Sequence, residues 1–312
     1  MKYYSHEEAF AIALDFFKSL GVEEWYNRAK EIIFSLHKRI GISIFNYPDV
    51  NNYDSTDKNG IKMYSIGSGI ESKIDDDNED LIKDQVPNSL VRISKNSRYY
   101  GISHVFNKDK MTLEDIQTIV HEISHSFDIS NDMDSIHKRH IIAEVTPFCF
   151  EKMFDEYLIS KNIVNKSILY SINTNRMHDV MYHARYVNTV INLYRIQKKS
   201  GEITKDGINE FLREKNINNI EYVRECFMDV IDSNYDFDYH VKYMIAGLVS
   251  HMYLKKFKEN KKNAIEKLQE YCKCLKEGNV GEETLELIGF DQENTSVKNA
   301  LDEFTNSFEG SR

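Results

Sequence analysis

The spacing of apolar positions along the chain predicts a protein that is mostly helical. Near the N-terminus, apolar residues recur at helical spacing after Ser5, which forms the pattern of a capping box with Glu8. Gly21 follows as a residue suited to the left-handed end of a helix, and a second helix is predicted at 22–37. Beyond Thr112 helical periodicity dominates, and the predicted helices there span 112–129, 136–160, 166–199, 205–215, 218–230, 235–258, 260–276 and 295–307.

Short strands are predicted only in the first third of the chain. Segments 42–45, 61–66, 90–94 and 99–106 are rich in apolar, β-branched and aromatic residues, and the last two could form a hairpin. Between 49 and 89 the composition shifts to Asn, Asp, Ser, Gly and Lys, which predicts a long polar loop, either a lid or a solvated insertion. The expected fold is therefore mostly α with one small β-sheet, and this pattern argues against a doubly wound sheet or a barrel.

Charge and composition narrow the possible partners. The 312 residues carry a net charge of −10, which argues against a nucleic-acid-binding surface. No apolar run reaches the ~20 residues that span a bilayer, and the first ten residues lack the apolar stretch of a signal peptide. The four cysteines are too few for a disulfide framework. Cys272 and Cys274 form a single CxC motif without a second pair of cysteines, which does not suffice for a zinc site. We expect a cytoplasmic protein without membrane or nucleic-acid partners; export without a classical signal would leave the same pattern, and the oligomeric state is not indicated.

The most informative motif is HEISH at 121–125, an HExxH string on a predicted helix. Thr112 and Asp115 form the cap of that helix, and its apolar residues occupy one stripe. His121 and His125 fall on the opposite side, about 40° apart, so both imidazoles can reach one zinc ion. Glu122 then lies beside the metal, where it can accept a proton from a zinc-bound water.

A catalytic zinc needs three protein ligands and one open position for water. A metzincin would have a glycine three residues after His125 and a histidine six residues after it, but this chain has Asp128 and Asn131 there. The third ligand should come from a following helix, and spacing alone does not choose it. The candidates are Glu144, Glu151, Glu156, His137 and His140. Other histidines, among them His183, are interpreted as structural.

Four stretches of the chain point to a known family. They are YYSHEEAFAIALDFFKSLG (3–21), HKRIGIS (37–43), SHVFNKDKMTLEDIQTIVHEISHSFD (103–128) and AEVTPFCFE (143–151). The sequence resembles the zinc oligopeptidases of the thimet oligopeptidase and oligoendopeptidase F family, and oligoendopeptidase F more closely. The resemblance implies a helical zincin of the gluzincin type, with 1–312 as a single catalytic domain that lacks the N-terminal lobe of longer relatives. It also implies one zinc ion, with Glu144 as the third ligand and Glu151 as a carboxylate that orients a histidine ligand.

A fifth stretch, NYDFDYHVKYMIAGL (234–248), is similar to the C-terminal helix of that family, whose His and Tyr side chains surround the reacting carbonyl. The resemblance implies that Tyr239, His240 and Tyr243 donate hydrogen bonds to the oxyanion. The chain departs from the family here. When the family's helix motif is aligned with this stretch on Gly247, the family's histidine falls at Asn234, and its tyrosine positions are displaced by about one residue.

The expected function is zinc-dependent hydrolysis of short, unfolded oligopeptides. The strand at 99–106 would bind an extended peptide by strand addition along its edge. Two alternatives stay open. One is a catalytically silent peptide-binding relative, suggested by Asn234 and by Ser124 where the family often has Gly. The other is a specialised protease that cuts one protein substrate. The sequence does not indicate the natural substrate or separate endo- from exopeptidase activity.

Overall fold

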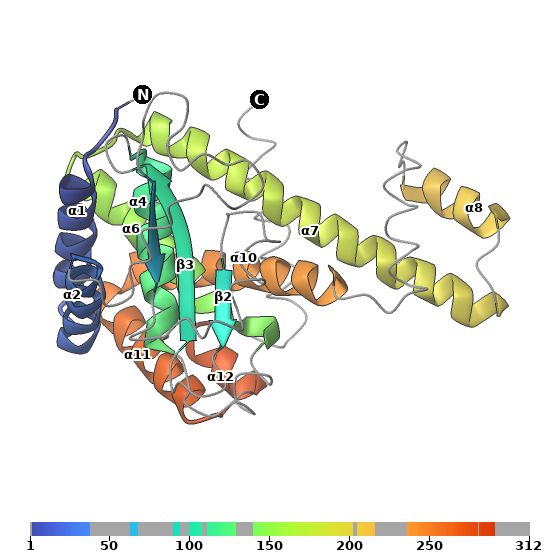
Figure 1. Ribbon diagram of the computed structural model, residues 1–312. Helices are drawn as coiled ribbons and strands as arrows, with labels where there is room; N and C mark the ends of the chain where they lie inside the picture. The colour runs from blue at the N-terminus through green and yellow to red at the C-terminus, as the bar shows by residue number, and fades with distance from the viewer. Residues whose placement is uncertain are drawn as a thin grey trace, which may run out of the picture.

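A computed structural model describes the arrangement of most of the helical part of the chain (Figure 1). The described residues are 2–37, 63–67, 90–93, 100–107, 111–128, 140–201, 205–215, 236–279 and 281–290. The predictions for 42–45, 218–230 and 295–307, and most of the polar loop at 49–89, lie outside them. Within the described ranges helices predominate, so the expectation of a mostly helical fold is confirmed.

Two N-terminal helices, α1 (His6–Ser19) and α2 (Glu23–His37), agree with the sequence prediction. The Ser5 hydroxyl accepts a hydrogen bond from the Glu8 amide at 3.3 Å, and the Glu8 carboxylate accepts one from the Ser5 amide at 2.8 Å. This reciprocal pair is the capping box that the pattern predicted. Gly21 has a φ of +74°, the left-handed conformation that separates the two helices.

The described strands form a three-stranded antiparallel sheet in the order β1-β3-β2, with β1 at Met63–Gly67, β2 at Leu90–Ile93 and β3 at Tyr100–Asn107. β3 is the middle strand and pairs with β1 over 103–107 along one edge and with β2 over 100–103 along the other. Each edge of β3 is therefore partly occupied by a neighbouring strand. The addition of an extended peptide along the 99–106 strand stays a prediction.

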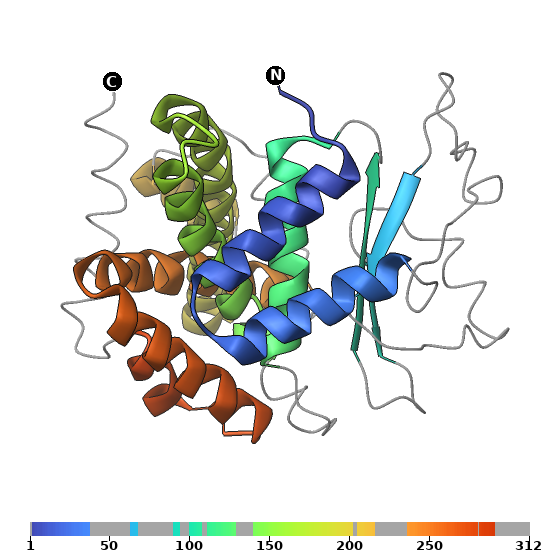
Figure 2. The ribbon, with the colours of Figure 1, turned by 90° about the vertical axis from the view of Figure 1, so that its left-hand side faces the viewer.

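The HExxH motif lies on α4 (Leu113–Ser124), which continues as a short 3-10 helix at His125–Phe127. The Thr112 hydroxyl accepts from the Asp115 amide at 3.2 Å, and the Asp115 carboxylate accepts from the Thr112 amide at 2.6 Å, as the capping pattern predicted. α4 lies against α1 (Figure 2), and its apolar stripe is buried in the core. Its buried members are Leu113, Ile116, Ile119, Val120 and Ile123.

The next predicted helix, at 136–160, is not continuous. Residues 136–139 lie outside the described ranges, and from His140 onward the structure has a short 3-10 turn at His140–Ile142 and then α6 (Val145–Ser160). Pro147 lies in the first turn of α6, where its missing N–H is not needed, and its ring prevents a continuous helix from running through this point. Glu144 is consequently the N-cap residue of α6.

The remaining described helices are α7 (Lys166–Ser200), α8 (Lys205–Lys215), α10 (Asp236–Glu259), α11 (Lys261–Lys276) and α12 (Glu282–Leu287). The first four match their predicted bounds to within one residue, and α12 was not predicted. α10 packs against α6, α7 and α11 (Figure 1). None of the helices in the described ranges combines the length and the apolar character needed to cross a bilayer.

Buried contacts fix α4, α6 and α7 relative to one another. Asp155 on α6 accepts hydrogen bonds from Gln117 on α4 at 2.5 Å and from Asn173 on α7 at 2.9 Å. Trp25 of α2 packs its ring 4.8 Å from that of Phe150 on α6. The hydrogen bonds of Asp155 hold the three helices whose side chains form the cluster described next.

Candidate metal centre

Two histidines and a glutamate meet where α4 ends and α6 begins. His121 and His125 are one turn apart, and Glu144 reaches them from the N-cap of α6. Glu144 Oε2 lies 3.2 Å from His121 Nε2 and 3.5 Å from His125 Nε2. One potential ligand atom from each of the three residues falls within 4.8 Å of the others, so the group could hold a metal ion.

A second carboxylate lies behind His121. The Nδ1 atom of His121 donates to Glu151 Oε1 at 2.7 Å, and Glu151 Oε2 forms an ion pair with Arg176 of α7 at 2.9 Å. When His121 is neutral with its proton on Nδ1, its Nε2 lone pair faces Glu144. This is the arrangement by which a carboxylate orients a histidine ligand.

The electrostatics of the cluster favour a positive charge between these side chains. Burial alone would lower the pKa of His121, but hydrogen bonds to Glu144 and Glu151 and the charges of nearby carboxylates raise it to about 10. Burial would raise the pKa of Glu144, but His125 and His121 bring it well below its ordinary range. A divalent cation would satisfy the same carboxylates and displace the proton from His121.

The donor set of the cluster also fits a metal. Glu122 Oε2 is buried and has no hydrogen-bond partner, whereas buried polar atoms are normally paired. Two imidazole nitrogens and one carboxylate oxygen suit zinc, and Co²⁺ or Mn²⁺ could bind to the same atoms. Glu122 itself is buried beside the cluster, and its charge acts on both His121 and Tyr243.

Of the three α10 residues expected near the reacting carbonyl, Tyr243 is linked to the cluster through Phe148. Its ring is 5.9 Å from that of Phe148, which in turn is 5.9 Å from His121. Burial and then the charge of Glu144 raise the pKa of Tyr243, so its hydroxyl stays protonated and can donate. The Tyr239 ring is tilted against that of Tyr243, with the centroids 4.7 Å apart, and Tyr239 is 43% exposed.

His240 packs against α7. Its Nδ1 lies 2.7 Å from His183 Nδ1, and its ring stacks on Tyr186 with the centroids 3.7 Å apart. His183 also stacks on Tyr243 at 5.1 Å. The sequence suggested only a structural role for His183. It lies 57 residues from His240, and nothing in the local pattern signals that the two meet.

Other sequence candidates lie elsewhere. Glu156, weighed as a third ligand, forms an ion pair with Lys258 at 2.8 Å and is not part of the cluster. The side chains of His137 and His140 are outside the described residues. Sequence reasoning missed two basic residues, Arg176 and Lys242, because single basic residues on long helices resemble an ordinary solvated face.

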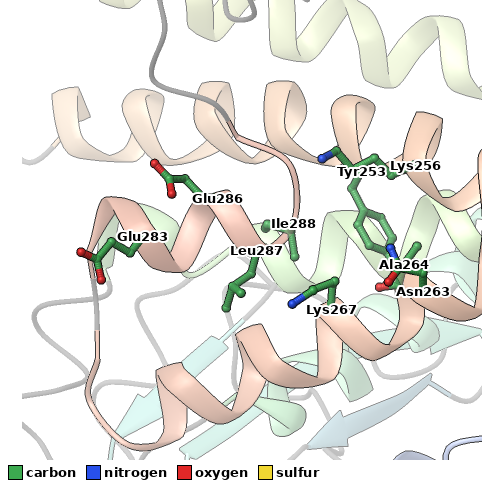
Figure 3. Close-up of a pocket in the computed structure, with 9 residues that line it drawn as sticks. All are labelled: Tyr253, Lys256, Asn263, Ala264, Lys267, Glu283, Glu286, Leu287 and Ile288. Atoms are coloured by element: carbon green, nitrogen blue, oxygen red, sulfur yellow. The ribbon is translucent and has the colours of Figure 1, made fainter.

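A separate hollow of about 310 Å³ lies between α10, α11 and α12 and includes none of the predicted site residues (Figure 3). Tyr253 and Ala264 are buried at its inner side. Lysine and glutamate side chains, including Lys256 and Glu286, surround it. Among the described residues, the side chains around this hollow do not form a group that could hold a metal ion.

Comparison with known proteins supports the fold. No protein-family model matches the chain, and no curated protein matches it. A solved structure of a candidate oligoendopeptidase F from Bacillus anthracis str. Ames superposes on 96% of this chain with a TM-score of 0.53 and 13% sequence identity. This chain spans 46% of the length of that protein. The described helices of this protein therefore have the same overall arrangement as part of an oligoendopeptidase-like helical fold.

Proposed function

We propose that this protein is a zinc-dependent metallopeptidase, similar to oligoendopeptidase F and of the gluzincin type, that hydrolyses short unfolded oligopeptides. The observation that carries the proposal is the group of His121, His125 and Glu144 with Glu122 buried beside it. The name of the solved structure with the similar fold supports the same reaction class. A cluster of this kind on that fold favours hydrolysis over binding alone.

His121, His125 and Glu144 would hold one zinc ion through two nitrogens and one oxygen. When bound, such an ion supplies Lewis-acid polarisation and lowers the pKa of a water molecule to about 7. Glu151 keeps the His121 ring in place through the 2.7 Å hydrogen bond at Nδ1. Arg176 in turn holds the other oxygen of Glu151, so the carboxylate cannot rotate freely.

Glu122 would act as the general base and then as the general acid. Its carboxylate is buried, and one oxygen has no hydrogen-bond partner and is free to accept a proton from the attacking water. The same carboxyl group then delivers the proton to the nitrogen of the departing amine. Proton transfer of this kind typically contributes about 10²–10⁴-fold to a rate.

Tyr243 would donate a hydrogen bond to the carbonyl oxygen as negative charge develops on it. Its hydroxyl remains protonated because burial and nearby carboxylates raise its pKa. Loss of one such donor typically costs about 10²–10³-fold in kcat. Tyr239 and His240 would flank the same region, with Tyr239 beside Tyr243 and His240 braced against α7.

The test is mass spectrometry of a mixed peptide library incubated with the wild-type protein, with Glu122→Gln and with the control Glu156→Gln. We expect cleavage by the wild type and by Glu156→Gln, and zinc binding without cleavage by Glu122→Gln. Full activity of Glu122→Gln would refute the role of Glu122. Zinc binding with no peptide cleavage by any of the three would favour a silent binding protein or a protease for one folded substrate. Incubation with a panel of folded proteins then separates those two.

A further inference from the structure

Two carboxylates of the cluster share one arrangement: each has one oxygen facing a histidine and the other facing a basic side chain. Glu151 lies between His121 at 2.7 Å and Arg176 at 2.9 Å. Glu144 has Oε2 toward His121, whereas its Oε1 forms an ion pair with Lys242 Nζ at 3.0 Å. The pairing of Lys242 with Glu144 is the only ion pair that ties α10 to a candidate metal ligand among the described residues.

Lys242 is held firmly where it lies. Its side chain is 14% exposed, so it is not a solvated surface lysine. The ammonium group lies 5.5 Å from the ring centroid of Tyr239 and 5.0 Å from that of Tyr243, both within the range of cation–π attraction. The two tyrosine rings and the Glu144 carboxylate therefore hold the ammonium group in place.

We propose that Lys242 is a positioning residue that makes Glu144 a ligand through one oxygen only, an inference that rests on the metal centre of the proposed function. The ammonium occupies the side of the carboxylate where Oε1 lies, so only Oε2 faces the histidines. A carboxylate that binds through both oxygens fills two coordination positions. Binding through one oxygen keeps a position open, as a catalytic site requires.

The charge of Lys242 has a second consequence. A fixed ammonium beside a dication repels it, so the lysine keeps metal binding weaker than the three ligands alone would allow. Removal of the ammonium should therefore tighten metal binding while it changes the coordination. A lysine that merely stabilised the helix packing would give the opposite result, because its loss would loosen the ligands.

The experiment uses the full chain loaded with Co²⁺, whose visible absorption is strong with four ligands and weakens when a fifth is added. The variants are Lys242→Met, Lys242→Arg and the control Lys258→Met. Lys258 is a matched control because it also joins α10 to a glutamate of α6, Glu156, at 2.8 Å, away from the cluster. Circular dichroism and thermal unfolding establish that each variant is folded, and chelator competition gives the metal affinity.

We expect Lys242→Met to lose absorption intensity and to bind Co²⁺ about tenfold more tightly than the wild type. Lys242→Arg and Lys258→Met should retain the wild-type spectrum and affinity. An unchanged spectrum in folded Lys242→Met, or weaker Co²⁺ binding, would overturn the role of Lys242. No Co²⁺ binding by the wild type would overturn the metal centre itself. These readouts need no peptide, so a failure to cleave peptides leaves the assignment of Lys242 to be decided by the spectrum alone.

Discussion

Replacement of Glu151 tests whether the carboxylate behind His121 sets the affinity of the proposed metal centre. Glu151 is 7% exposed and accepts the His121 Nδ1 proton at 2.7 Å. Glu151→Ala removes this acceptor and frees the ring to turn. Glu151→Gln keeps an acceptor oxygen but removes the charge, so its effect should be smaller and in the same direction.

The magnitude follows from two independent estimates. A hydrogen bond to a charged group contributes about 1.5–3 kcal/mol, which corresponds to about a 10- to 150-fold change in an equilibrium constant. Loss of a carboxylate that orients a histidine ligand typically costs about 10–100-fold in metal affinity. We therefore expect Glu151→Ala to weaken zinc binding by about 10–100-fold. The Arg176 side chain is 24% exposed, so its charge can turn to water and global stability should fall less than for a fully buried ion.

The assay is competition between the protein and a zinc-binding indicator, with Glu156→Ala as a control on the same helix. Denaturant unfolding in the presence of a chelator measures the stability of each variant without metal. Equal zinc affinity in wild type and folded Glu151→Ala would refute the reasoning, because His121 would then be oriented by something other than Glu151. Equal effects of Ala and Gln would show that charge, and not the acceptor atom, is decisive.

Three further outcomes are expected. Removal of zinc by a chelator should lower Tm by about 5 °C relative to protein with metal at about 100 times its Kd, as differential scanning calorimetry would detect. Burial, His240 and Lys242 lower the pKa of His183 to about 4, so the unfolded chain binds more protons between about pH 6.5 and 4. The free energy of unfolding should therefore fall as the pH falls through that window. Urea titrations at several pH values should show a weaker pH dependence in His183→Phe, and an unaltered pH dependence would argue against the lowered pKa of His183. A Cβ at Gly247 would overlap the Val180 side chain, so Gly247→Ala should reduce the free energy of unfolding by about 1–3 kcal/mol. Val180→Ala should restore part of this loss, and an unchanged stability of Gly247→Ala alone would contradict the close contact.

The local part of the site could be predicted because it depends on helical geometry alone. His121 and His125 are one turn apart on any α-helix, and the Thr112 cap fixes where that helix begins. The third ligand could not be found in this way, since its position depends on how α6 packs against α4. Only the resemblance to a family singled out Glu144, which lies at a helix boundary that the periodicity of apolar residues does not show.

Contacts between distant helices were the part that sequence reasoning missed. Lys242 meets Glu144 only because α10 crosses the start of α6, and His183 meets His240 because α7 and α10 pack closely at Gly247. Neither crossing leaves a periodic signal in one segment. α12 was missed for a different reason: its six residues are too few to show a helical repeat.

The position of Glu144 at the first turn of α6 also affects how the protein tolerates insertions and deletions. The carboxylate is placed by the packing of α6 on α4, so the number of residues between His125 and Glu144 does not itself set the ligand geometry. Variants with more or fewer residues between His125 and Glu144 should therefore keep the same donor atoms together wherever α6 keeps its packing on α4, so evolution or protein engineering could change the length of this connection without rebuilding the site.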